Sequence, residues 1–225
     1  MTAKEFARYF DHTLLRANAT EADFRAYCAD CAAYSFAMAA VNPAPVALCK
    51  QLLRGTAVHV GAAVGFPLGQ NTIETKRFEA QDAIANGADE IDYVVNLTRL
   101  KAGDLDYVAR EMDAIVGVCR EKGMISKVIF ENCYLTHEEK LTLCAVAREV
   151  RPDYVKTSTG FGTGGATMED VRLMLDHVGP DIRVKAAGGV RDLATALTLI
   201  DMGVRRIGST ASVRIVEAFK EKYGE

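Results

Sequence analysis

The chain has 225 residues, a formal net charge of −3 and a sequence pI of about 5.9, and 49% of its residues are hydrophobic. This length suits one sizeable domain, which we place at residues 1–225, and the mild acidity argues against a nucleic-acid-binding surface. No apolar run approaches the roughly 18 residues of a transmembrane helix, and the first residues lack the apolar segment of a secretory signal. We therefore expect a cytoplasmic protein that binds neither nucleic acid nor membranes.

Runs of β-type residues alternate with helical patterns from end to end. Eight such runs can be recognised, at Tyr9–Asp11, Phe36–Val41, Val58–Val64, Glu90–Val95, Ser126–Glu131, Tyr154–Ser158, Arg183–Ala187 and Arg205–Gly208. Between them, apolar residues recur at the i, i+3, i+4 and i+7 spacing of amphipathic helices. Because parallel strands need crossover helices, eight β–α units in this length predict an α/β fold, a single (β/α)8 TIM barrel. A doubly wound open sheet is the alternative.

The six cysteines and four histidines give no sign of a disulfide framework or a metal site. A chain of this size does not need disulfides for stability. Cys28 and Cys31 have C-x-x-C spacing, but they share a helical face with Phe24 and Tyr27, and zinc would need a second ligand pair. The histidines show no H-x-H or H-x-x-x-H spacing. We interpret the two cysteines as buried apolar residues and expect no metal or cofactor.

Side-chain alternation along the strands points ionisable groups into the predicted barrel. In the run Glu90–Val95, Ile91 and Tyr93 form an apolar face that suits the helix layer, so Glu90 and Asp92 point inward. The same reasoning directs four groups of later runs inward: Lys127, Glu131, Lys156 and Lys185. A structural charge network is one interpretation. We favour a catalytic one, because two lysines and Asp92 converge near the C-terminal ends of their strands, where barrel active sites lie.

Lysine chemistry suggests what such a set could do. Only the neutral amine attacks a carbonyl, and an ordinary lysine, with a pKa of about 10.4, is neutral in about one molecule in 2,500 at pH 7. Desolvation and a nearby positive charge both lower that pKa. Lys156 and Lys185 on neighbouring strands would supply the repulsion, and Asp92 would move protons, through water. One lysine would form an imine, and alternation alone leaves open which.

The last two strands add a candidate phosphate site. Gly188 and Gly189 end one strand, and Gly208-Ser209-Thr210 leads from the next strand into a helix that continues towards Tyr223. The free N–H groups of a helix N-terminus bind anions, and the loops after strands seven and eight form the common phosphate site of barrel enzymes. We therefore expect a phosphorylated ligand here.

Six segments spread over nearly the whole chain resemble the 2-deoxyribose-5-phosphate aldolase family of class I aldolases. They are Asp11–Leu15, Val64–Gly69, Asp89–Asp92, Lys127–Glu131, Lys156–Phe161 and Lys185–Gly189, and the run Lys-Thr-Ser-Thr-Gly-Phe with its Gly165-Ala166-Thr167 continuation is the most specific. The resemblance implies a (β/α)8 fold and reversible cleavage of 2-deoxy-D-ribose 5-phosphate to D-glyceraldehyde 3-phosphate and acetaldehyde. It implies small phosphosugars and aldehydes as the binding partners. We also expect a homo-oligomer, a dimer or a tetramer.

The resemblance also implies roles for individual residues. Lys156 matches the lysine that forms the Schiff base, Lys185 matches the lysine that perturbs it and relays protons, and Asp92 matches the proton donor and acceptor. The remaining residues implied to bind substrate are Asp11, Thr13 and Thr159, for water or hydroxyls, and Gly160, Gly188, Gly189, Ser209 and Thr210, for the phosphate.

Two positions depart from the family pattern. Many members carry a cysteine where this chain has Ala40, and the phosphate loop Gly208–Ser212 reads Gly-Ser-Thr-Ala-Ser instead of Gly-Thr-Ser-Ser/Ala-Gly. Three other functions remain as alternatives. A phosphosugar isomerase or epimerase would use carboxylate bases, and a metal-dependent aldolase would need metal ligands. A non-catalytic sugar-phosphate-binding scaffold would have no use for the two lysines and Asp92.

Overall fold

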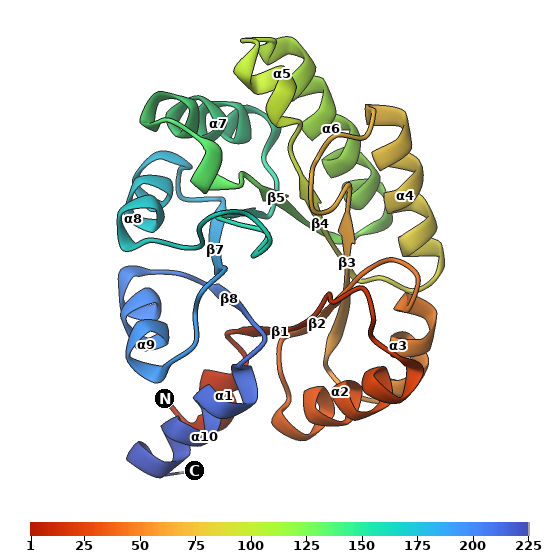
Figure 1. Cartoon of the computed structure of the whole chain (residues 1–225), viewed down its shortest axis with the longest axis vertical. Coiled ribbons are helices and arrows are strands. Elements are labelled where there is room, and N and C mark those ends of the chain that lie inside the picture. The colour runs from red at the N-terminus through yellow and green to blue at the C-terminus, as the bar shows by residue number, and fades with distance from the viewer. Residues whose placement is uncertain (225) are drawn as a thin grey trace.

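Eight short parallel strands pair in sequence order and close into a barrel in the computed structural model, which describes residues 1–224 (Figure 1). The strands are β1 Phe10–Leu14, β2 Met38–Val41, β3 His59–Val64, β4 Glu90–Val94, β5 Ile125–Ile129, β6 Tyr154–Lys156, β7 Arg183–Ala187 and β8 Arg206–Ser209. The last strand pairs with the first, with Phe10 opposite Ile207. The closed barrel confirms the predicted fold and rules out the open sheet.

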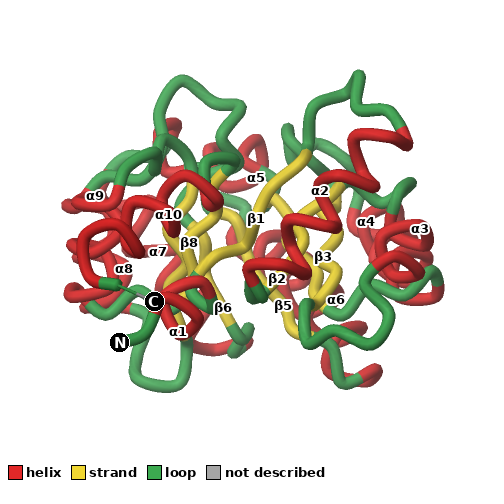
Figure 2. The backbone as a smooth tube through the Cα atoms, turned by 90° about the horizontal axis from the view of Figure 1, so that it is seen from below, coloured by secondary structure: helices red, strands yellow, loops and turns green. Residues whose placement is uncertain are grey.

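Helices surround the strands on the outside, as the perpendicular view in Figure 2 shows. They are α1 Ala3–Ala7, α2 Glu21–Tyr34, α3 Val46–Leu52, α4 Ile73–Ala85, α5 Leu97–Lys101, α6 Leu105–Lys122, the 3₁₀ helix η1 Asn132–Tyr134, α7 His137–Val150, α8 Met168–His177, α9 Leu193–Met202 and α10 Ser212–Tyr223. The two ends of the chain lie together, where the rings of Phe6 in α1 and Phe219 in α10 stack 4.4 Å apart.

Hydrophobic side chains fill the layer between strands and helices, and the barrel interior carries charge instead. Ile91, Tyr93 and Val95 are fully buried in the outer apolar layer, as their alternation predicted. Local signals set the helix ends: Thr136 and Glu139 form a reciprocal capping box at the start of α7, which satisfies two otherwise free N–H groups. Gly123, at φ 68°, ends α6 in the left-handed region that favours glycine.

The strand bounds differ from the sequence prediction by one to three residues in every strand except β7, and two of the differences have a clear structural reason. β1 continues past Asp11 to Leu14, because the polar residues His12 and Thr13 still pair in register with Ala39 and Ala40 of β2. β6 stops at Lys156 instead of Ser158, because the hydroxyl of Thr157 donates to the carbonyl of Ala187 and the chain turns into a loop.

The cysteines behave as expected. All six are free, and Cys28 and Cys31 are buried in the apolar layer beneath α2. Within residues 1–224, none of the helices combines the length and the apolar character that crossing a membrane requires.

Candidate active site

Asp92 lies at the centre of a cluster of lysines inside the barrel. It is the third residue of β4 and is only 3% exposed. Its Oδ1 lies 2.8 Å from Nζ of Lys127, and its Oδ2 lies 2.9 Å from Nζ of Lys156 and 2.7 Å from Nζ of Lys185. Strand pairing places these groups side by side, since Asp92 is in register with Lys127 and Lys156 with Lys185. The inward orientation expected for all four residues is confirmed.

A second set of charges lies beneath this cluster. Asp11 is fully buried and pairs with Lys185, 2.5 Å away, and with Arg206 of β8. Glu90 pairs with Lys127, with Arg206 at 2.7 Å, and with Nδ1 of His59 at 2.7 Å. Arg206 was not among the residues predicted to point inward, although the apolar Ile207 beside it in β8 marks position 206 as inward-facing.

Burial and neighbouring charges shift the pKa values of this cluster in opposite directions. Desolvation, together with the positive charge of Lys185, outweighs the attraction of Asp92 and lowers the pKa of Lys156 from 10.5 to about 8. Burial alone would raise the pKa of Asp92, but the charges of Lys127, Lys156 and Lys185 hold it well below its usual value. At pH 7 about 10% of Lys156 would be the neutral amine, compared with about one part in 3,000 for an unshifted lysine.

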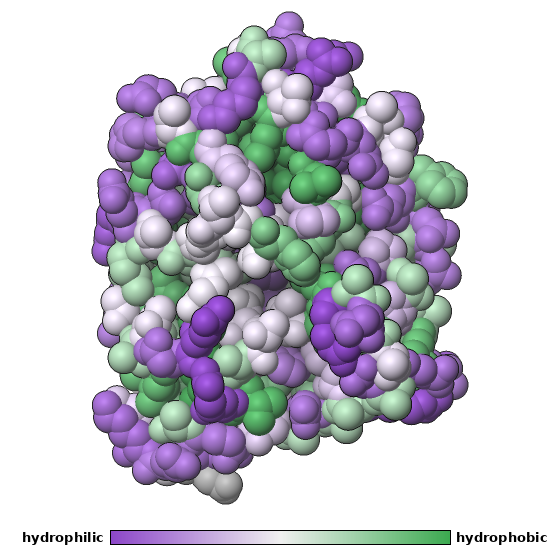
Figure 3. All heavy atoms as spheres, viewed as in Figure 1, coloured by the Kyte–Doolittle hydropathy of each residue, from purple (hydrophilic) through white to green (hydrophobic). Residues whose placement is uncertain are grey.

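Lys156 forms part of the wall of a cavity of about 290 Å³ at the carboxyl ends of the strands. The cavity is lined by Thr13, Leu15, Arg16, Ala40, Lys156, Thr159, Gly160, Phe161, Ala187, Gly188, Gly189, Val190, Arg191, Gly208, Ser209 and Thr210. Every residue expected to bind substrate is among them except Asp11, which is too deeply buried to line the cavity and instead holds Lys185. The surface drawn in Figure 3 is hollowed and mostly pale over the barrel.

Aromatic rings lie near Lys156. Nζ of Lys156 lies 6.0 Å from the ring centre of Phe66, and Phe66 makes an edge contact with Phe161 at 5.4 Å. The methyl side chain of Ala40 also lines the cavity. Lys156 is only 5% exposed, which agrees with desolvation as the main cause of its lowered pKa.

The other end of the cavity is built largely from backbone. Gly188 has a φ of 86°, and a side chain at Gly165 would come within 2.2 Å of the Gly188 carbonyl oxygen, so the two loops approach more closely than larger residues allow. The hydroxyl of Ser209 donates to the carbonyl of Val190 at 2.7 Å and accepts from the N–H of Ala211 at 2.9 Å. Ser209 therefore shapes the loop, and the exposed Thr210 is better placed to offer a hydroxyl to a ligand.

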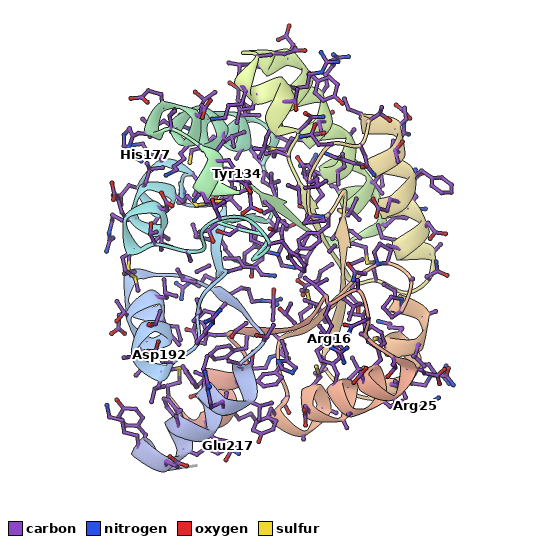
Figure 4. The ribbon with its side chains drawn as sticks, viewed as in Figure 1. Arg16, Arg25, Tyr134, His177, Asp192 and Glu217 are labelled. Carbon is purple, nitrogen blue, oxygen red and sulfur yellow. The ribbon has the colours of Figure 1, made fainter. Side chains whose placement is uncertain are left out.

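Two arginines at the mouth of the cavity were not foreseen. Arg16 follows β1 and Arg191 follows the Gly188–Gly189 turn, and both line the cavity. Figure 4 shows Arg16 near the centre of the ring, whereas Arg25 and Glu217 lie at its periphery. Because both arginines lie in loops, strand alternation could not indicate their direction. The sequence offered one indication that they could reach the cavity: they lie close along the chain to Thr13 and Gly189, which were expected to bind substrate.

Glu131 points inward as expected but lies apart from the lysine cluster. It follows β5 with a left-handed backbone, at φ 58° and ψ 58°, and its carboxylate accepts hydrogen bonds from the backbone and hydroxyl of Thr159. This backbone turn lifts the side chain out of the strand's alternation towards the loop after β6. Among residues 1–224, no three His, Cys, Asp or Glu side chains are grouped as metal ligands would be.

Comparisons with known proteins agree with this geometry. Residues 6–206 match the model of the DeoC/LacD family of aldolases. A deoxyribose-phosphate aldolase of Bacteroides thetaiotaomicron is 53% identical over 98% of this chain and 93% of its own, and one of Thermococcus gammatolerans is 50% identical over 96% and 97%.

Solved structures give the same result. A putative deoxyribose-phosphate aldolase from Coccidioides immitis has a TM-score of 0.93 and 35% identity, covering 98% of this chain and 87% of that one. The deoxyribose phosphate aldolase from Aeropyrum pernix, described as a unique tetramer, has a TM-score of 0.90 and 32% identity, covering 98% and 93%. Near-complete coverage, high identity and the lysine-lined barrel together show that the chain belongs to the deoxyribose-phosphate aldolases of the DeoC/LacD family.

Proposed function

We propose that this aldolase cleaves 2-deoxy-D-ribose 5-phosphate reversibly to D-glyceraldehyde 3-phosphate and acetaldehyde, through a Schiff base on Lys156. The observation that carries the assignment of Lys156 is its position. It is the one lysine of the cluster that lines the cavity, and its pKa is lowered to about 8. Lys127 and Lys185 lie behind it, and each contacts two carboxylates.

The reaction begins when the neutral amine of Lys156 attacks the aldehyde carbon C1 of the open-chain sugar. The resulting carbinolamine loses water to give the protonated imine, which withdraws electrons from the bond between C2 and C3. As the C3 hydroxyl loses its proton, that bond breaks, and D-glyceraldehyde 3-phosphate leaves. C2 of the remaining enamine then takes up a proton, and hydrolysis of the imine releases acetaldehyde and the free lysine. The reverse sequence forms the carbon–carbon bond.

The contacts of Asp92 and Lys185 support a role for both in the proton transfers of these steps. Oδ2 of Asp92 contacts Nζ of Lys156 at 2.9 Å and Nζ of Lys185 at 2.7 Å. We assign Asp92, with Lys185, to proton transfer at the carbinolamine hydroxyl and at C2, with water as the intermediary where the distance requires it. Lys127 and Arg206 stay charged, because nearby carboxylates raise the pKa of both.

The substrate phosphate occupies the end of the cavity away from Lys156. Gly160, Gly188, Gly189, the loop Ser209–Thr210 and Arg191 all line the cavity. Backbone N–H groups and an arginine suit a phosphate dianion. Thr13 and Thr159 also line the cavity and would meet the substrate hydroxyls.

Trapping the imine tests this proposal. The protein is incubated with acetaldehyde and reduced with borohydride, and the modified peptide is identified by mass spectrometry. We expect an ethyl group on Lys156. An adduct on Lys185 would reverse the roles of the two lysines, and the absence of any adduct would refute the Schiff base. A phosphosugar isomerase or epimerase with carboxylate bases would give none.

We also propose that the protein is a cytoplasmic homo-oligomer, a dimer or a tetramer. The solved relative from Aeropyrum pernix is described as a tetramer. Phe78 on α4 is 69% exposed, and Leu68 is 71% exposed, and large apolar side chains on a surface are often covered in an assembly. The six free cysteines suit a reducing compartment. Light scattering coupled to gel filtration would measure the mass, and a monomer would contradict the assembly.

A further inference from the structure

The buried carboxylate of Glu131 is not used by the reaction described above. Glu131 is 2% exposed and takes a left-handed backbone conformation, which a residue other than glycine rarely adopts. Such a conformation persists only where surrounding contacts hold it, and it is found disproportionately at functional sites. The carboxylate must therefore be held by specific partners.

Its partners belong to the loop that forms the cavity wall. The N–H of Thr159 donates to Oε1 and Oε2 of Glu131 at 3.2 and 3.3 Å, and the hydroxyl of Thr159 makes a short contact with Oε2. The loop passes directly over the carboxylate: a side chain at Gly162 would come within 2.8 Å of Sγ of Cys133 and 3.3 Å of Cδ of Glu131. Glu131 thus fixes both the backbone and the side chain of Thr159.

These contacts determine which way the Thr159 hydroxyl can act. A hydroxyl has one proton to donate and two lone pairs that accept. A carboxylate only accepts, so the proton of Thr159 points at Glu131. One lone pair accepts from the N–H of Phe161 at 3.0 Å. The remaining lone pair is free for the cavity, which Thr159 lines together with Lys156. Thr159 can therefore offer a substrate an acceptor but not a donor.

We propose that Glu131 is a positioning residue that fixes Thr159 as a hydrogen-bond acceptor, and that this pair selects acceptor aldehydes carrying a hydroxyl next to the carbonyl. The inference rests on the proposed function. Acetaldehyde has no such hydroxyl, whereas D-glyceraldehyde 3-phosphate has one. Thr159 is followed by Gly160, which lies against Gly188, and both glycines line the same cavity as Thr159. With the phosphate bound at these glycines, as proposed above, the hydroxyl beside the phosphate-bearing carbon would lie next to Thr159.

Two acceptors that differ in one hydroxyl test the proposal. The kcat/KM for carbon–carbon bond formation with acetaldehyde is measured for D-glyceraldehyde 3-phosphate and for 3-oxopropyl phosphate, which lacks only the hydroxyl next to the aldehyde. The variants are Glu131→Gln, Thr159→Val and Thr159→Ser, with Glu121→Gln on the exposed surface of α6 as a matched control. Glu131→Gln keeps the shape. With its amide oxygen at the Oε1 position, accepting from the N–H of Thr159, its N–H₂ group faces the hydroxyl and turns the Thr159 proton towards the cavity.

We expect the ratio of the two kcat/KM values to fall about 10- to 100-fold in Glu131→Gln and Thr159→Val, the range for a lost hydrogen bond to a charge-assisted group. The deoxy acceptor itself should change less than about 3-fold, and Thr159→Ser and Glu121→Gln should keep the wild-type ratio. Thermal unfolding of each variant checks its folding, and Glu131→Gln remains informative if Thr159→Val is unstable.

Two results would overturn the inference. An unchanged ratio in both Glu131→Gln and Thr159→Val would remove any role in selecting the hydroxyl. A parallel fall for both acceptors would show that Glu131 only stabilises the loop. Borohydride trapping on Lys156 distinguishes a failure of this inference from a failure of the proposed function. If the wild-type protein forms no acetaldehyde adduct, both are refuted. If the adduct forms but the ratio of the two kcat/KM values is unchanged in the variants, only the inference is refuted.

Discussion

Replacing Lys185 with methionine tests how the reactive amine is tuned. Nζ of Lys156 and Nζ of Lys185 both contact Oδ2 of Asp92, at 2.9 and 2.7 Å, so they lie at most about 5.6 Å apart. At an effective dielectric constant of about 20, their repulsion is then about 3 kcal/mol, or about 2 pKa units. We expect Lys185→Met to raise the pKa of Lys156 from about 8 to about 9–10, part of the shift remaining because burial is its larger cause.

The consequence is a slower imine step at neutral pH. The neutral fraction of Lys156 at pH 7 would fall from about 10% to about 0.1–1%, so kcat/KM should drop about 10- to 100-fold, with most of the loss recovered at high pH. The measurement is kcat/KM for cleavage between about pH 6 and pH 10.5, whose rising limb reports the pKa of the free enzyme. Lys185→Arg, which keeps the charge, is the control and should retain the wild-type midpoint. A midpoint in Lys185→Met that stays near pH 8 would refute the electrostatic role of Lys185.

Further predictions follow from the same contacts. Lys156→Met should abolish the acetaldehyde adduct, and an adduct elsewhere would contradict the assignment. The pKa of Lys156 is about 8 in the folded protein and 10.5 for an ordinary lysine, so the unfolded chain binds more protons between these values. The free energy of unfolding should therefore rise with pH by about 3 kcal/mol across that window in the wild type but not in Lys156→Met. Urea unfolding of the wild type and of Lys156→Met at several pH values measures this difference. The same pH dependence in both proteins would count against a lowered pKa of Lys156. Asp92→Asn should lower kcat about 10²- to 10⁴-fold in the cleavage assay, whereas a loss below about tenfold would exclude proton transfer by Asp92. Lys76 and Glu111 form a buried ion pair at 2.7 Å. Lys76→Met alone should lower the free energy of unfolding by about 3–5 kcal/mol, and adding Glu111→Leu should restore part of that loss. Denaturant unfolding measures these changes, and a Lys76→Met variant as stable as the wild type would contradict the prediction. Dialysis against a chelator should leave cleavage unchanged, and activity restored by added zinc would point to a metal-dependent aldolase.

The fold could be predicted because strand periodicity and element order are local signals. Residues Ile91 and Tyr93 lie in the outer layer and Asp92 lies inside, as alternation requires, and closure of the barrel follows from eight such units. The end of β1 was missed because His12 and Thr13 are polar, and a sequence window cannot show that they pair with β2. Boundaries of this kind depend on the neighbouring strand, not on the residues alone.

The candidate site was predicted where its residues lie on strands and missed where they lie on loops. Lys156 and Lys185 come together because register sets them side by side. Arg191 and Arg16 reach the cavity from loops, whose course has no period. Glu131 shows the limit most clearly: its inward direction was correct, but a left-handed backbone directs it to Thr159 instead of the lysines. Only the three-dimensional structure gives that conformation.

The arrangement of charges explains why one lysine of the cluster is reactive. The ion pairs inside the barrel join four cations, Lys127, Lys156, Lys185 and Arg206, to three carboxylates, Asp11, Glu90 and Asp92. Within residues 1–224, Lys127, Lys185 and Arg206 each pair with two of these carboxylates, whereas Lys156 pairs with one, Asp92. The network is therefore electrically balanced when one of its four cations is neutral, and Lys156 is the cation with a single carboxylate partner. In a buried site, where an unbalanced charge is costly, the proton is lost most easily from Lys156, the lysine that faces the cavity. Strand alternation left open which lysine attacks, and this charge balance favours Lys156, the lysine that the family resemblance implied.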